Sequence, residues 1–345
     1  MALLLARIRI CRLHQQLENP FLRLSSLYAG VSQNSVEESL KTVVTNKKYE
    51  QIPDLLTFLE ESHNKQNPFS FLSSFTLSQR TLVVDEMLQS FISLKPHSRL
   101  KTSYHYLLAY TLQCPDLFPH ALATLQRIIR SGCTPVPQTY LSMSSAWIDQ
   151  QKQYKSVPRI LLSMKSIGYR PDCGTCNFVI KSLCAVDQME EADEVLRGML
   201  EVGCFPDVES YCTIISALCA LRKTDKAVVM MKEMAGKLSL SPRQGTLVRL
   251  MSALRANKEI WRAVEVIEFL EKKEFHIGFE SYELVLEGCL ECKEFILAGK
   301  MAMMMTDRGN IPYIKVRQKV IEGLAGVGEW ELACSVRHRF AELNS

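Results

Sequence analysis

Apolar residues recur along the chain after Ser98 with a period of 35 or 36 residues. One column contains only alanine, at Ala192, Ala227, Ala263, Ala298 and Ala333. A second column holds bulky residues, at Ile128, Met164, Met199, Met234, Leu270, Met305 and Phe340. Columns that keep one register over many units indicate an internal repeat and predict an array of stacked units.

Each unit has the pattern of two helices joined by a short polar turn. In unit 173–207, two apolar stripes flank the turn 186–188: Phe178, Val179, Leu183 and Cys184, then Ala192, Val195, Leu196 and Met199. Gly203 followed by Pro206 is typical of a helix end. A hairpin of this kind cannot bury its apolar faces alone, so neighbouring hairpins are expected to stack into a solenoid.

Small and turn-forming residues keep the same register. Glycine precedes proline by three positions at Gly132–Pro135, Gly168–Pro171, Gly203–Pro206 and Gly309–Pro312. The first helices carry a column of small residues, Ser182, Ala217, Ala253, Gly288 and Gly323. We expect this column to face the alanines, because small side chains let two helices lie close together.

The register divides residues 99–345 into seven units: 101–136, 137–172, 173–207, 208–243, 244–278, 279–313 and 314–345. Residues 34–98 have a looser helical pattern, which predicts a degenerate helical N-terminal cap. The predicted fold is therefore all-α, a right-handed α-solenoid of stacked 35-residue helical hairpins.

Composition narrows the class of protein. The 345 residues are 47% hydrophobic and 23% charged, which is enough apolar content for a large core and excludes a disordered chain. No apolar run approaches the roughly 18 residues of a membrane-spanning helix. The net charge of +4 is too small to indicate nucleic-acid binding.

Most of that charge lies at the amino terminus. Residues 1–33 contain four arginines, no lysine and one acid, Glu18, and contribute +3. Arginine-rich, acid-poor, amphipathic segments are typical of organelle transit peptides, and this one favours import into the mitochondrion over the chloroplast. A basic N-terminal helix is the alternative.

The candidate motifs for chemistry have simpler interpretations. Cys173–Cys176 and Cys289–Cys292 are Cys-x-x-Cys pairs, but 113 residues separate them, so packing cysteines are favoured over a zinc site. The glycine-rich segment 323–328 falls on the turn of the last unit. Trp147, Trp261 and Trp330 are interpreted as packing residues. No catalytic motif is present, and we expect no enzyme activity, no cofactor, no metal and no small-molecule substrate.

The units resemble the pentatricopeptide repeat (PPR) of plant organelles. Its closing Pro-Asp matches residues 171–172 and 206–207, and its Leu-Cys pair matches residues 183–184 and 218–219. The Trp-x-x-Leu-Gly-x-x-Tyr opening of tetratricopeptide repeats is missing. The chain resembles the pure-repeat P subfamily, since no room remains for an appended catalytic domain. Residues 49–56 are similar to the opening of the short thylakoid-assembly-type members.

The resemblance implies binding of single-stranded organellar RNA, in which the fifth and last residues of each unit recognise one base. Asn177 with Asp207 is the one complete pair, and family analogy implies uracil. The other pairs depart from the family pattern: His105 with Val136, Leu141 with Asp172, Cys212 with Arg243, Val248 with Gly278, and Glu283 with Tyr313. The candidate RNA-binding residues are Asn177, Asp207, Asp172, Cys212, Arg243 and His105.

The second position of each unit, where the family places an apolar residue against the base, also departs from the pattern. It holds Thr102, Gln138, Gly174, Glu209, Gly245, Glu280 and Lys315. The implied function is non-enzymatic RNA binding in intron splicing, transcript stabilisation or translation. The alternative is a protein-interaction scaffold in an organellar ribosomal or splicing complex, with a peptide in its concave groove. Other proteins or a second copy of the chain, as a homodimer, are the possible further partners.

Overall fold

The computed structural model describes residues 33–57 and 66–343, which contain seventeen α-helices and no strand. The N-terminal part comprises α2 (Gln33–Thr45), α3 (Ile52–Thr57) and α4 (Leu77–Ser93), with 3-10 turns at Tyr49–Gln51, Ser70–Ser74 and His97–Leu100. The predicted transit peptide, residues 1–33, lies outside the described residues except for Gln33, which begins α2.

Fourteen helices follow as seven hairpins. The first helices are α5 (Lys101–Gln113), α7 (Gln138–Tyr154), α9 (Cys173–Ala185), α11 (Val208–Ala220), α13 (Gln244–Ala256), α15 (Phe279–Glu291) and α17 (Ile314–Gly326). The second helices are α6 (Phe118–Arg130), α8 (Val157–Leu162), α10 (Met189–Glu201), α12 (Thr224–Lys237), α14 (Ile260–Lys272), α16 (Phe295–Asp307) and α18 (Trp330–Glu342). Short 3-10 turns at Pro115–Leu117 and Ser163–Ile167 complete the first two hairpins.

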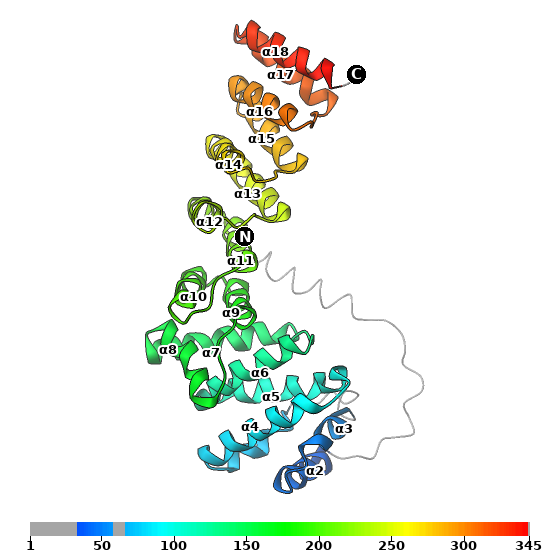
Figure 1. Cartoon of the computed structure of the whole chain (residues 1–345), viewed down its shortest axis with the longest axis vertical. Helices are drawn as coiled ribbons and strands as arrows, with labels where there is room; N and C mark the ends of the chain where they lie inside the picture. Colours follow the sequence, from blue (N-terminus) through cyan, green and yellow to red (C-terminus); the bar gives the residue numbers. More distant parts are fainter. Residues whose placement is uncertain (1–32, 58–65, 344–345) are drawn as a thin grey trace, which may run out of the picture.

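The hairpins stack in chain order, as Figure 1 shows from α5 and α6 up to α17 and α18. Each first helix packs against the next one from α5 to α17, whereas α10 and α12, and likewise α14 and α16, pack more loosely. Over most of the array the first helices lie closer together than the second helices, so the array curves with the first helices on its inner side. The last two hairpins differ, since α16 and α18 pack more closely than α15 and α17. The predicted all-α solenoid is confirmed.

The two apolar columns form the core between the helices. All five column alanines are at most 5% exposed, and the bulky column from Ile128 to Phe340 is at most 4% exposed. Met301 and Met305 are fully buried, so their methionine-rich segment packs in the core. Trp147 is also buried, but the packing prediction is wrong for Trp261 and Trp330, which are 62% and 64% exposed.

The small residues of the first helices have a different neighbour from the one expected. A Cβ atom added at Gly288 would come within 2.5 Å of Cδ1 of Ile260, the first residue of α14. A Cβ atom at Gly323 would overlap the ring of Phe295, the first residue of α16. These glycines therefore receive a bulky side chain from the preceding hairpin, and they set the distance between hairpins.

A residue with left-handed backbone conformation follows the second helix of each hairpin from α6 to α16. In the second hairpin it follows the 3-10 turn Ser163–Ile167. Gly132, Gly168, Gly203 and Gly309 have φ between 73° and 82°, as the glycine column predicts. The two units without glycine reach the same conformation with Ser239 (φ 52°) and Glu274 (φ 60°). A non-glycine residue in this region costs roughly 1–2 kcal/mol, so stacking of the hairpins outweighs local preference there.

Ion pairs connect neighbouring hairpins along the second helices. They join Arg197 to Glu233, Lys226 to Glu190, Lys232 to Glu265, Arg262 to Asp225, Arg308 to Glu271 and Arg339 to Asp307. Exposed pairs of this kind contribute about 0–1 kcal/mol each. Their larger effect is on charge distribution, because they keep many of the basic residues on the outer side of the array.

The contact between Gly323 and Phe295 predicts the effect of one methyl group. Gly323→Ala should destabilise the last hairpin by about 1–3 kcal/mol, because the Phe295 ring must move. Gly326→Ala in the same helix is the control, since a Cβ atom there meets no atom within 4 Å. Faster amide hydrogen exchange in α17 and α18 of the first variant alone supports this packing, and equal exchange in both variants contradicts it.

Candidate nucleic-acid interface

The first helices present one row of side chains along the array. The fifth, ninth and thirteenth residues of each unit lie on one helix face, because they are spaced four apart. We call this row of residues the inner stripe. From α5 to α17 it contains His105, Ala109, Gln113; Leu141, Ser145, Asp149; Asn177, Lys181, Ala185; Cys212, Ser216, Ala220; Val248, Ser252, Ala256; Glu283, Glu287, Glu291; Gln318, Glu322 and Gly326. The inner stripe is mostly small or uncharged and becomes acidic on α15.

Asn177 and Asp207 meet across the interface between α9 and α11. Asn177 Nδ2 donates to Asp207 Oδ1 at 3.0 Å, and Asn177 Oδ1 accepts from Ser210 Oγ at 2.5 Å. Asn177 Nδ2 also lies 3.5 Å from Cys173 Sγ. Because Oδ1 faces a hydroxyl donor and Nδ2 faces a carboxylate, the network sets the orientation of the amide.

Asp207 is at the same time the N-cap of α11. Its Oδ1 accepts from the backbone N–H of Ser210 at 2.9 Å, and its own N–H donates to Ser210 Oγ at 3.0 Å, which forms a capping box. Partial burial raises the pKa of Asp207, but hydrogen bonds from Ser210, Asn177 and Cys173 outweigh it and hold the pKa below its usual value. The carboxylate is therefore ionised at neutral pH.

Asp172 performs the capping role without the partner at the fifth position. Its Oδ1 accepts from the N–H and hydroxyl of Thr175 at 2.9 and 2.6 Å, and its Oδ2 pairs with Arg130 at 2.8 Å. The fifth residue of its unit, Leu141, is 62% exposed and offers no hydrogen bond. Unit 137–172 therefore presents an apolar surface next to a carboxylate whose two oxygens are already bonded to Thr175 and Arg130.

The structure does not bring Cys212 and Arg243 together as a recognition pair. Cys212 is only 4% exposed, and the guanidinium of Arg243 forms an ion pair with Glu209. Glu209 is the second residue of the unit, one turn before Cys212. The long side chain of Arg243 thus reaches the carboxylate of Glu209, and the thiol of Cys212 remains beneath the surface.

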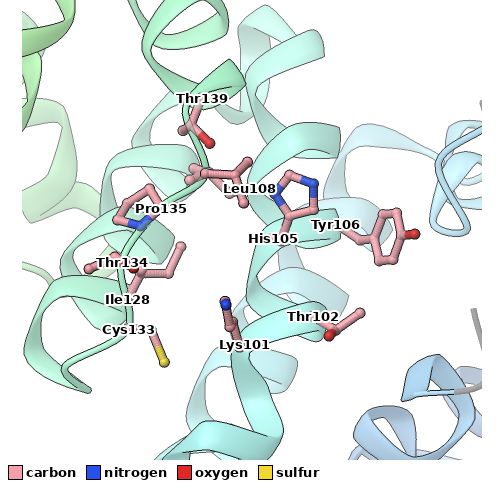
Figure 2. Close-up of a pocket in the computed structure, with 11 residues that line it drawn as sticks. Lys101, Thr102, His105, Tyr106, Leu108, Ile128, Cys133, Thr134, Pro135 and Thr139 are labelled. Carbon is pink, nitrogen blue, oxygen red and sulfur yellow. The ribbon is translucent and has the colours of Figure 1, made fainter. Parts of the chain in front are cut away.

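His105 lies at the wall of a cavity between the first two hairpins. The cavity has a volume of about 240 Å³ and is lined by Lys101, Thr102, His105, Tyr106, Leu108, Ile128, Cys133, Thr134, Pro135, Val136 and Thr139. Figure 2 shows the imidazole of His105 between the Pro135 loop and Tyr106. Burial lowers the pKa of His105, so the ring is neutral at neutral pH. Val136, the last residue of the unit, lies in the same wall.

Glu283, the fifth residue of unit 279–313, is buried beneath the surface of α15. It is 7% exposed, and burial, assisted by the charge of Glu287, raises its pKa. The accessible acid on this helix comes instead from Glu280, Glu287 and Glu291. Arg255 from the preceding hairpin pairs with Glu287 and Glu291, both at 2.5 Å.

Two residues of the interface were not among the candidates from sequence. Ser210 is the third residue of the following unit and holds the carbonyl end of Asn177. Lys181, one turn after Asn177 on the inner stripe, is exposed, and its Nζ lies 5.4 Å from the centre of the Tyr140 ring. The spacing of four from Asn177 is the signal that identifies Lys181. No comparable signal in unit 173–207 alone identifies Ser210.

Within residues 33–57 and 66–343, no three His, Cys, Asp or Glu side chains are grouped so that they could hold a metal ion. In that same part of the chain, no helix has the length and apolar character needed to cross a bilayer.

Comparison with known proteins places these features in a family. The PPR repeat family model matches residues 171–220, and the PPR repeat model matches residues 209–237. A pentatricopeptide repeat-containing protein of Arabidopsis thaliana is 53% identical over 326 residues, which is 94% of this chain and 94% of that protein.

Solved structures are more distant. The maize pentatricopeptide repeat protein PPR10 has 15% identity and a TM-score of 0.32, and the match covers 90% of this chain and 54% of that one. Its complex with an 18-nucleotide psaJ RNA element has 17% identity and a TM-score of 0.33, with coverage of 86% and 42%. The chain thus spans about half the length of these structures. With a relative that is 53% identical over nearly its full length, the chain belongs to the pentatricopeptide repeat family.

Proposed function

We propose that this protein binds single-stranded RNA along the inner stripe of its first five hairpins and acts without catalysis in organellar RNA metabolism, such as intron splicing, transcript stabilisation or translation. The observation that carries the proposal is the network of Asn177, Asp207 and Ser210. It holds one amide in a fixed orientation on the inner side of the array, where a base edge can meet both its donor and its acceptor.

The chemistry of this amide suits uracil. An amide oxygen has two lone pairs, and Oδ1 of Asn177 accepts from Ser210 with one of them, so it can also accept from a base. The two hydrogens of Nδ2 are directed to Asp207 Oδ1 and Cys173 Sγ, and a base carbonyl can replace the sulfur, which is a weak acceptor. Uracil offers an N–H next to carbonyl oxygens, which is the complementary pattern. Because Ser210 and Asp207 already hold the side chain, binding costs little conformational entropy.

The distribution of charge indicates which units the RNA contacts. Lys181 is exposed one turn from Asn177, and Arg249 is exposed on α13. Both can neutralise phosphates along units 101–278. On α15 the acidic residues oppose a phosphate backbone, since like charges at short range repel. We infer that the RNA lies on the first five hairpins.

The composition of residues 1–33 supports import into the mitochondrion, with the chloroplast as the alternative. A second candidate function, a protein-interaction scaffold in an organellar ribosomal or splicing complex, is favoured by the end of the array. There, acidic α15 adjoins Tyr313 and Ile314, which are 66% and 72% exposed. Such a surface suits a basic, partly apolar protein segment.

Replacement of the central amide tests the proposed function. Asn177→Ala should weaken binding of a uridine-rich single strand roughly tenfold, because about 1–1.5 kcal/mol of hydrogen bonding is lost. Gln318→Ala removes an amide at the same position of the last unit and should leave affinity unchanged. Fluorescence anisotropy at low salt measures both. Absence of binding by the unmodified chain, or equal affinity of all three proteins, contradicts the proposal.

Neutralising α15 tests the predicted path of the RNA. Glu280→Gln, Glu287→Gln and Glu291→Gln together should tighten binding of a long uridine-rich strand roughly three- to tenfold and steepen its salt dependence, because more phosphates become accessible. The control changes the same net charge on second helices, through Glu201→Gln, Glu268→Gln and Glu331→Gln. An equal gain in both triple variants shows a general charge effect and argues against the path.

Ribonuclease treatment separates the two candidate functions. If RNA binding is the function, proteins that co-purify with the chain from organelles should be released when the RNA is digested. A scaffold should keep its partners after digestion. Quantitative mass spectrometry of the retained proteins, with and without ribonuclease, distinguishes these outcomes.

A further inference from the structure

A second cavity lies beside His105, where the N-terminal part of the structure meets the first hairpin. It has a volume of about 410 Å³, between the segment that precedes α4 and the inner side of α5. Its lining residues are Gln66, Asn67, Ser70, His105, Tyr106, Ala109 and Gln113. Three of them, His105, Ala109 and Gln113, form the inner stripe of α5, so the cavity continues the inner stripe beyond the first repeat.

The wall of this cavity opposite α5 is attached to the helix by one hydrogen bond, and two further hydrogen bonds hold the shape of the wall itself. Asn67 Nδ2 donates to the backbone oxygen of Tyr106 at 2.8 Å, and Asn67 Oδ1 accepts from the N–H of Phe69 at 2.9 Å. Ser70 Oγ donates to the backbone oxygen of Asn67 at 2.5 Å, and the Phe69 side chain is fully buried. The cavity is therefore shaped before any ligand arrives.

The lining has the chemistry of a nucleobase site. The rings of His105 and Tyr106 lie 5.5 Å apart and provide aromatic surface. Gln66 and Gln113 are exposed at the rim, and each amide offers both a donor and an acceptor. Bases in single-stranded RNA are bound by this combination of aromatic stacking and hydrogen bonds to the base edge. None of the seven lining side chains is an acid, a lysine or an arginine, so an isolated anion or cation fits less well.

His105 and Tyr106 join this cavity to the one in Figure 2, because both residues line both cavities. Lys101, one turn before His105, lines the 240 Å³ cavity and supplies a cation near the point where the two cavities meet. Two successive bases can therefore contact His105 from the two cavities, with the phosphate between them near Lys101.

We propose that the cavity between residues 66–70 and α5 binds one additional nucleobase of the RNA, next to the base in the first repeat, with His105 and Tyr106 lining both base sites. This inference rests on the proposed function, and it identifies the non-repeat N-terminal part as an RNA-contacting part. The protein then contacts one base more than its repeats contact by themselves.

Filling the cavity tests this site in the full chain. Ala109→Phe places a ring in the cavity, and Gln113→Ala removes an amide from its rim without changing the core. Both should weaken binding of a uridine strand long enough to cover the array, roughly fivefold to hundredfold for the first variant, as expected for loss of one stacked base. In a series of strands lengthened by single nucleotides, affinity of the Ala109→Phe variant should stop rising one nucleotide earlier than that of the unmodified chain.

Ala341→Phe, on the exposed side of α18, and Gln318→Ala are the matched controls and should behave like the unmodified chain. Circular dichroism and hydrogen exchange of α5 verify that the variants are folded. If the unmodified chain binds RNA and Asn177→Ala weakens it, but both cavity variants match the unmodified chain at every length, the site is refuted while the proposed function stands. If the unmodified chain binds no RNA, both proposals fail.

Discussion

The close approach of successive hairpins is the constraint on which the rest of this structure depends. A helical hairpin of 35 residues exposes two apolar faces, and only the next hairpin can bury them. Small residues at Ala263 or Gly288 leave space for a neighbouring helix, and bulky first residues such as Ile260 fill it. Because this contact repeats along the array, each first helix is held at a set height relative to the next.

That spacing creates the proposed recognition site. Asn177, Asp207 and Ser210 come from a helix, a cap and the following helix, and no two of them are neighbours within one turn except Asp207 and Ser210. Their hydrogen bonds form only because α9 and α11 are stacked at the distance that the core sets. The carboxylate that caps α11 also orients the amide, so the stability of a helix end and the chemistry of the site depend on one side chain.

The same backbone supports different chemistry where single residues depart from the repeat pattern. Arg243 reaches Glu209 because its side chain is long, and Cys212 is covered. Glu283 is buried, and the other acidic residues of α15 give the inner stripe a negative charge there. A regular fold with an irregular inner stripe fits the proposal that RNA contacts one part of the array and leaves another part for other contacts.

Periodic and local features followed from the amino-acid order alone: the helical hairpins, the buried alanine and methionine columns, and the left-handed glycines. These depend on a residue's own helix and on a register that repeats many times. The tertiary structure decided which side chains meet, as with Ser210 at Asn177, Arg243 at Glu209, the exposure of Trp261, and the cavity beside His105. Such contacts depend on side-chain length, on the neighbouring hairpin and on non-repeat segments. The residue type at a repeated position carries no information about these three factors.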